Sequence, residues 1–306
     1  MRKAKIYTIL ASIVMLMTTL TSCEKFALEE SDTDSHDTDS NVTIRVNEVQ
    51  GTSFSSITKA DDNNVALSDV CSRLTFAIFD GEDKLGTTNQ TSSDASFGTA
   101  HFNLDEGEYA LVVIAHNGKG NCSITQPDKV KFANNKLTDT FYYYGTLNVS
   151  EEGANAEIEL KRVVGALRLN IDGTIPDSIK SIKFYYLGGS STLDATTGYG
   201  NVNSRQTEVF SIENGTQDFM VYTFPHQEEK DIKMTISLLD ANGDVVKSYQ
   251  KTDLKLKRNV LTKTSINLDG SEIKGDDSEK EDKGESGGIT ITFDPKWTAE
   301  ENVNFE

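Results

Sequence analysis

The chain is poor in the residue types that cross-link a small fold or bind nucleic acid. Its 306 residues include only three cysteines, four histidines, four prolines and one tryptophan. Lysine and arginine number 30 against 48 aspartates and glutamates, which gives a net charge of −18. Nucleic-acid binding needs clustered basic side chains that neutralise phosphates. This charge balance therefore makes nucleic acid a poor partner.

Signatures of catalysis and of metal binding are also scarce. The four histidines do not form the closely spaced His-Glu-x-x-His pair of a zinc enzyme. We expect His116 to be a satisfied histidine at a strand end rather than a functional group, and we interpret His101 in the same way. The sequence thus predicts a protein that is not an enzyme and has no metal site and no cofactor.

The first residues predict export and lipid attachment. Residues 2–5 carry three positive charges, residues 6–20 are apolar, and the sequence LTSC follows directly and ends at Cys23. This order is a lipobox, which predicts a lipoprotein signal peptide at residues 1–22 and acylation of Cys23. The alternatives are an ordinary secretory signal or an uncleaved helical anchor. Two or more acyl chains hold a soluble domain on a membrane almost permanently.

Lipid attachment sets the expected location of the rest of the chain. The leader has three basic and no acidic residues, so the net charge of −18 becomes −21 in the mature protein. Residues 23–40 hold seven carboxylates and form an acidic tether between lipid and fold. Calcium binding by this tether is a weaker reading, because it has no glycine for an EF-hand turn. We expect a chain anchored in the outer membrane and exposed at the cell surface.

Apolar and polar residues alternate along most of the remaining chain, and helical periodicity is almost absent. Alternation with a period of two places successive side chains on opposite faces of a strand. The sequence therefore predicts an all-β fold of short strands. The pair Asn242-Gly243 lies between two such strands and predicts a hairpin, because both residues tolerate positive φ.

The predicted strands fall into two series. Residues 76–85 and 236–246 both read as strand, Asp-containing turn and strand, and each series ends on an alternating strand. About seven short strands in each series suit two tandem antiparallel β-sandwich domains. We place these domains at residues 41–160 and 161–270.

Two cysteines remain once Cys23 is acylated, and they lie in an oxidising compartment. Cys71 precedes the predicted strand 73–80, and Cys122 follows the predicted strand 108–117. If these strands are antiparallel neighbours, the two thiols come within reach of a disulfide. We predict that disulfide, with two separate buried thiols as the alternative.

The C-terminal region has an unusual order of segments, because a linker comes before a short predicted strand. Residues 271–288 form an acidic linker, and a strand-like piece follows within residues 289–306. Ile289, Ile291 and Phe293 would share one face of this strand. A free, alternating strand can join a sheet by β-augmentation, so these three residues are candidates for a donor strand. The linker is long enough for the strand to join a sheet of this molecule or of another.

The sequence resembles the FimB-like minor fimbrial subunits and anchor lipoproteins of type V pili, a fimbrillin-like family. The order and spacing of several stretches carry the resemblance: the lipobox, CSRLTFAIFD (71–80), GEYALVVIAHN (107–117), LKRVVGALRLNI (160–171), Phe224-Pro225 and RNVLTKTSINL (258–268). The resemblance implies transthyretin-like sandwiches and a structural role in surface fimbriae. It also implies assembly by donor-strand exchange with other fimbrial subunits.

A surface glycan-binding lipoprotein is the alternative function. Tandem sandwiches on cell-surface tethers also bind sugars, and such a platform would need exposed aromatic rings on one surface. The candidates are Tyr142 to Tyr144, Phe184 to Tyr186, Tyr199 and Trp297. Consecutive aromatic residues in a strand must place one face inward, so we expect several of these rings in the core.

Overall fold

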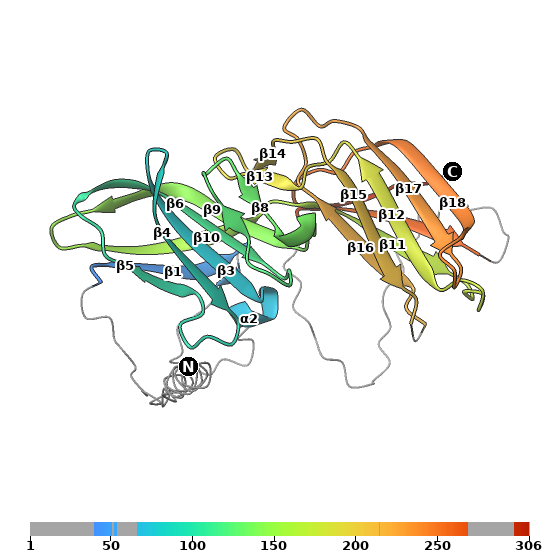
Figure 1. Cartoon of the computed structure of the whole chain (residues 1–306), viewed down its shortest axis with the longest axis horizontal. Coiled ribbons are helices and arrows are strands. Elements are labelled where there is room, and N and C mark those ends of the chain that lie inside the picture. Colours follow the sequence, from blue (N-terminus) through green and yellow to red (C-terminus); the bar gives the residue numbers. More distant parts are fainter. Residues whose placement is uncertain (1–39, 51, 54–65, 214, 269–296, 306) are drawn as a thin grey trace, which may run out of the picture. The chain divides into compact units, whose positions relative to one another are not determined.

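Strands dominate the part of the chain that the structure describes. The structure is a computed structural model, and it describes residues 40–50, 52–53, 66–213, 215–268 and 297–305 (Figure 1). Within these ranges the only helical elements are α2 (Leu67–Val70) and the 3-10 turn η1 (Ala133–Asn135). The predicted all-β fold of sandwich domains is confirmed.

The first sandwich is built from residues 42–162. Its strands are β1 (Val42–Val49), β2 (Thr52–Ser53), β3 (Arg73–Asp80), β4 (Asp83–Thr91), β5 (Thr99–Phe102), β6 (Gly107–His116), β9 (Thr140–Val149) and β10 (Ala154–Arg162). Strands β4, β3, β6 and β9 form one layer, and β5, β1 and β10 form the other. The end of β10 also pairs with β9, which makes the two layers one continuous sheet around the first core.

Strand β1 shows how the alternation fills this core. Val42, Ile44 and Val46 are buried, and their neighbours are half-buried or exposed. A bulge between Val46 and Glu48 then shifts the register, and Val49 is buried as well. Full burial of such a side chain stabilises the fold by about 1.5–3 kcal/mol.

The second sandwich follows the connection at residues 163–164. Its strands are β11 (Gly165–Asp172), β12 (Ser181–Leu187), β15 (Arg205–Ser211), β16 (Asp218–Thr223), β17 (Ile232–Leu239), β18 (Val245–Leu254), β19 (Val260–Asn267) and β20 (Ala299–Asn302). They form two layers, ordered β16-β11-β19-β20 and β15-β12-β17-β18. A second apolar core lies between these layers.

The two sandwiches share one strand order, as the sequence repeat suggested. In each, the first strand pairs in parallel with the last long strand, β1 with β10 and β11 with β19. In each, the second layer has a central strand flanked by two antiparallel partners, β3 by β4 and β6, and β12 by β15 and β17. These parallel pairs are a feature that the prediction of antiparallel sandwiches did not include. Strands that begin and end a domain can lie side by side in one direction, because a whole domain separates them in sequence.

The predicted hairpin at Asn242-Gly243 is present between β17 and β18. The Asp240 carboxylate accepts hydrogen bonds from the backbone N–H groups of Asn242 (2.8 Å) and Asp244 (2.9 Å). Gly243 has a φ of +85°, whereas Asn242 is not among the residues with positive φ. The turn therefore uses one left-handed residue and an Asp side chain instead of the two left-handed residues of a type I′ turn.

A small third sheet joins the two sandwiches. Its strands are β7 (Ser123–Ile124), β8 (Val130–Lys131), β13 (Thr192–Asp194) and β14 (Tyr199–Gly200), in the order β14-β13-β8-β7. Strands β7 and β8 lie between β6 and β9 in sequence, whereas β13 and β14 lie between β12 and β15. The pairing of Leu193 with Val130 thus connects the two halves of the chain.

An apolar cluster accompanies this sheet, which we call the junction cluster. It contains Ala77, Phe79, Val112 and Ile114 from the outer face of the first sandwich, Val163 and Val164 from the connection, and Leu193 and Phe224 from the second half. All of these side chains are buried. The outer face of β3 and β6 is therefore covered, which explains why these two strands are apolar on both faces.

Candidate functional sites

Several of the predicted site residues lie outside the described residues. These are Cys23, the expected lipid-attachment site, and the donor-strand candidates Ile289, Ile291 and Phe293. His36 and the acidic segments 23–39 and 271–288 lie outside them as well. Within the described ranges, no helix has the length and apolar character needed to cross a bilayer.

The two remaining cysteines do not form the predicted disulfide. Strands β3 and β6 are antiparallel neighbours, as expected, and Arg73 lies opposite His116. However, Cys71 packs in the first core, whereas Cys122 belongs to the junction cluster on the other face of the same sheet. Both thiols are free and buried. The structure therefore corrects the prediction to its alternative, two separate buried thiols.

Burial makes both thiols poor nucleophiles. It raises the pKa of Cys71 to about 12, and the negative charge of Asp139 adds to this effect. Burial likewise raises the pKa of Cys122 to about 11. Because the thiolate is the reactive form, neither residue has the character of a catalytic or redox-sensing cysteine.

The last described residues of the chain form a strand of their own, beyond the predicted strand at residues 289–294, which lies outside the described residues. Residues 299–302 are β20, which pairs in parallel with β19 at the edge of the second sandwich. The Thr298 backbone N–H and hydroxyl donate to the Asn259 carbonyl at 3.0 and 2.7 Å. Phe305 is buried in the second core, with 5% of its side chain exposed. Residues 297–305 thus complete a sheet of the same molecule.

Ion pairs hold the outer side of β20. Glu301 accepts a hydrogen bond from Lys257 at 2.7 Å, and Glu300 pairs with Lys263. Hydrogen bonding and the negative charge of Glu301 raise the pKa of Lys257. These pairs are partly exposed and screened by solvent, so they contribute little to stability. Burial of Phe305 therefore accounts for more of the stability of this segment than the ion pairs do.

The residues at the end of β10 build a buried ionic site at the junction of the two sandwiches. The Arg162 side chain is fully buried, and it donates to both carboxylate oxygens of Asp139 at 2.8 and 2.7 Å. Its guanidinium lies 3.9 Å from the ring centre of Trp297 and 4.9 Å from that of Phe141. It also donates to the Asn259 side chain at 3.4 Å. One side chain thus contacts the first sandwich, the second sandwich and the C-terminal segment.

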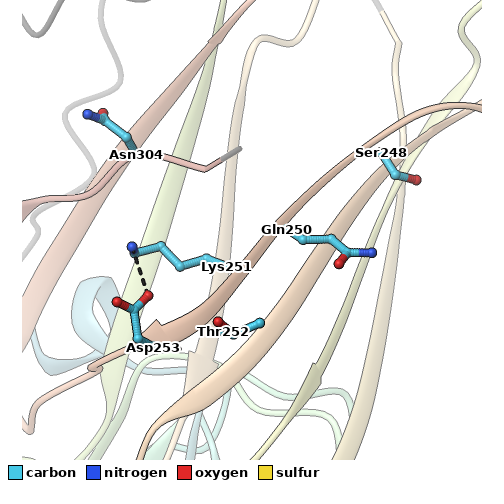
Figure 2. Close-up of a pocket in the computed structure, with 6 residues that line it drawn as sticks. All are labelled: Ser248, Gln250, Lys251, Thr252, Asp253 and Asn304. Carbon is cyan, nitrogen blue, oxygen red and sulfur yellow. Dashed lines mark ion pairs between the residues drawn. The ribbon is translucent and has the colours of Figure 1, made fainter.

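A polar hollow of about 600 Å³ lies beside β18 (Figure 2). It is lined by Ser248, Gln250, Lys251, Thr252, Asp253 and Asn304. Lys251 donates to Asp253 at 2.9 Å, and this hydrogen bond lowers the pKa of the carboxyl group. Asn304 of the C-terminal segment lines the same hollow (Figure 2). Such a set of groups can form hydrogen bonds with a polar ligand but includes no nucleophile next to a base.

The histidines are dispersed. His116 is buried at the end of β6, where its Nδ1 accepts a hydrogen bond from the Gly118 N–H at 3.0 Å and its ring packs edge-on against Phe132. His101 is exposed on β5 and shares a hydrogen bond with Thr43. No group of three potential metal ligands occurs among the residues that the structure describes.

The aromatic candidates for a glycan platform are dispersed too. Phe184 and Tyr186 are in the second core, and Tyr142 and Tyr143 pack against two different clusters. Tyr199 stacks under Arg258 at 4.6 Å. Tyr144 and Tyr185 remain at the surface, on different sandwiches. The rings therefore do not form one shared platform.

Sequence reasoning missed the junction site and the role of Trp297. It placed the domain boundary between residues 160 and 161, whereas β10 continues to Arg162 and pairs there with Phe141 of β9. The sequence did contain one signal for this site. Arg162 stands at the start of the apolar run RVVGAL, and a charge that is buried with such a run needs a partner. That partner, Asp139, lies 23 residues away in sequence, and the sequence alone gave no reason to pair the two residues.

Comparison with known proteins identifies a family for this chain. Residues 34–303 match the family described as fimbrillin-A associated anchor proteins Mfa1 and Mfa2. The chain therefore belongs to this family, which confirms the resemblance found in the sequence. No curated protein matches the chain.

Several solved structures are similar to this chain. A putative adhesin from Bacteroides ovatus ATCC 8483 is 13% identical, with 80% of this chain and 93% of that chain covered and a TM-score of 0.45. A fimbrial assembly protein from Parabacteroides distasonis ATCC 8503 is 11% identical, with 76% and 91% covered and a TM-score of 0.36. A third structure, described as putative polysaccharide binding proteins from Bacteroides thetaiotaomicron VPI-5482, is 11% identical. It matches over 68% of this chain and 78% of that chain, with a TM-score of 0.41.

Proposed function

We propose that this chain is a minor or anchor subunit of a surface fimbria, held on the outer membrane by lipid on Cys23. The family match over residues 34–303 is the observation that carries the proposal, because it covers both sandwiches and the C-terminal segment. The lipobox supports the anchoring part, and the acidic tether supplies a solvated spacer between lipid and fold.

We also propose that the subunit joins its neighbours by donor-strand exchange through Ile289, Ile291 and Phe293. The placement of β20 supports this mechanism, since it shows that the C-terminal region supplies a strand to a sheet edge. An extended strand gains ladder hydrogen bonds and side-chain burial when it fills such an edge. The competing possibility is that residues 289–294 pair within their own molecule.

Anchoring is tested by Cys23→Ala. We expect the variant to leave the membrane fraction and appear as soluble exported protein, because no acyl chains remain to hold it. The unchanged chain, fractionated in parallel, is the control. A Cys23→Ala variant that stays fully in the membrane fraction would refute lipid anchoring at this residue.

Strand donation is best tested by substitution, because truncation after Asp269 would also remove Trp297 and Phe305. We propose the triple variant Ile289→Thr, Ile291→Thr, Phe293→Thr, which retains strand propensity but removes the apolar face. The matched control is Thr290→Ser, Thr292→Ser on the opposite face. Donor-strand exchange predicts lost attachment of fibres with an unchanged melting temperature. Normal attachment in the triple variant would rule out donation by these residues, and a lowered melting temperature would indicate intramolecular pairing.

A further inference from the structure

The strands β15, β12, β17 and β18 form one layer of the second sandwich (Figure 1), and the outer face of this layer differs in composition from the rest of this acidic protein. Ile182, Phe184 and Tyr186 of β12 point into the second core, so Lys183 and Tyr185 between them lie on the outer face. The strand register places Thr207 of β15 and Thr235 of β17 on either side of Tyr185. The centre of this face is thus a half-buried tyrosine between two threonines.

Three cations surround this tyrosine. Arg205 and Lys233 flank the same residue of β12, Leu187, from the two neighbouring strands, and Lys183 lies two residues from Tyr185 on the other side. Neighbouring strands are about 4.8 Å apart, so the backbones of Arg205 and Lys233 lie about 10 Å from each other. We call the set Lys183, Tyr185, Arg205, Thr207, Lys233 and Thr235 the basic face.

None of the residues paired in register with these cations on this face is a carboxylate, and Asp253, in the β18 bulge opposite Lys233, pairs with Lys251. The other outward positions in register with them on the four strands carry serine, leucine, valine and glutamine. Glu208 of β15 has the opposite orientation and pairs with Lys136 at 2.6 Å. Elsewhere in the second sandwich, cations such as Arg168 and Lys255 are paired with carboxylates. In a chain with a net charge of −18, three cations that make no ion pair among the described residues form a distinct positive surface.

We propose that the basic face binds an anionic polysaccharide, with uronic acid or sulfate groups at the cations and a sugar ring against Tyr185. Carboxylate and sulfate groups form charge-assisted hydrogen bonds with arginine and lysine. The two threonine hydroxyls can donate to and accept from sugar hydroxyls. The site is independent of the proposed fimbrial role, and it lies on a single sandwich.

A carbohydrate explains this composition better than a protein partner does. The centres of protein interfaces are depleted in lysine and serine and enriched in apolar and aromatic groups. The basic face has two lysines and one aromatic ring, and Val209, opposite Lys183 on β15, is an exposed apolar side chain beside it. A second copy of this chain is also a poor partner, because two strongly acidic molecules repel each other.

The test measures binding of the mature Cys23→Ala chain to two acidic glycans, heparin and polygalacturonate, with neutral dextran and polyglutamate as comparators. The variants are Tyr185→Thr and the double reversal Arg205→Glu, Lys233→Glu. The matched control is Lys119→Glu, Lys131→Glu, which reverses two exposed charges on other segments. Melting temperatures verify that each variant is folded.

We expect the chain to bind both acidic glycans and not to bind dextran. The double reversal should weaken binding at least about tenfold, which corresponds to about 1.4 kcal/mol, and the control pair should bind normally. Tyr185→Thr should weaken glycan binding but leave any weak polyglutamate binding unchanged. The proposal is overturned if neither glycan binds, if the control pair loses as much as the double reversal, or if polyglutamate binds as tightly and responds equally to Tyr185→Thr. The last result would indicate an acidic protein partner instead.

Discussion

At the scale of single residues, His116 connects the stability of the protein to pH. Burial lowers the pKa of His116 from 6.5 to about 4, and the positive charge of Arg73 adds to this effect. The unfolded chain therefore binds a proton at a higher pH than the folded chain does. The stabilisation is fully present above pH 6.5 and is lost progressively as the pH falls from 6.5 towards 4.

We predict that His116→Asn flattens this pH dependence. Asparagine can accept the Gly118 N–H with its side-chain oxygen but does not titrate. As the pH falls from 6.5 to 4, the free energy of unfolding of the native chain should decrease by roughly 3 kcal/mol more than that of the variant. Urea unfolding at a series of pH values measures this difference. The exposed His101→Asn is the control and should behave like the native chain. Equal slopes for the native chain and His116→Asn would contradict this role of His116.

The cysteines show what residue spacing can and cannot predict. Spacing correctly placed Cys71 and Cys122 near adjoining ends of neighbouring strands. It did not specify the face of the sheet, because Cys71 precedes β3 and Cys122 lies in the loop after β6, where strict alternation has ended. The structure places the two thiols on opposite faces, and that placement decides against a disulfide.

At the scale of elements, β20 depends mainly on one apolar anchor, Phe305, beside which the half-buried Val303 also packs against the second core. Its exposed positions carry Glu300 and Asn302, and the buried contact comes from Phe305, three residues beyond the strand. A four-residue edge strand has little stability of its own. The C-terminal segment should therefore detach when this anchor is removed.

We predict that Phe305→Ala destabilises the protein by about 2–4 kcal/mol, somewhat less than for a phenylalanine in the middle of a chain. Asn304→Ala, at the neighbouring exposed position, is the control and should change the free energy of unfolding by less than about 0.5 kcal/mol. Hydrogen exchange should also show lost protection at the edge of β19. If Phe305→Ala unfolds like the native chain, then the C-terminal segment is not anchored by this side chain.

At the scale of the whole molecule, the junction cluster and Arg162 couple the two sandwiches. The third sheet contains strands from both halves, and the Arg162–Asp139 pair is shielded from water beneath Trp297. A buried ion pair is strongly destabilising when one partner is removed, because the other charge is left uncompensated. We therefore expect the native chain to unfold in one cooperative transition.

We predict that Asp139→Asn uncouples the halves and costs about 3–5 kcal/mol. Trp297 is the only tryptophan of the chain, so its fluorescence reports on the junction, while circular dichroism reports on the sheets. The two signals should coincide in the native chain and separate in the variant, with fluorescence changing first. Asp218→Asn removes an exposed pair with Arg168 and is the control, with an expected cost below about 1 kcal/mol. Coincident transitions in Asp139→Asn would refute the coupling.

The sequence by itself determined the class of the fold and its repeat. Alternating side chains specify strands locally, and two similar series of strands specify two similar sandwiches. The lipobox and the family resemblance were also legible, because both depend on local order along the chain. The family match confirms the resemblance.

Only the tertiary structure decided how these local elements combine. The parallel pairs, the third sheet and the Arg162 site each bring together residues that are far apart in sequence. Alternation indicates which side chains share a face of a strand, but it does not indicate which segment covers that face. For β3 and β6 the cover came from segments 123–131 and 192–200, and for Arg162 it came from Trp297 near the end of the chain. These contacts depend on packing between distant segments, and therefore the three-dimensional fold alone could show them.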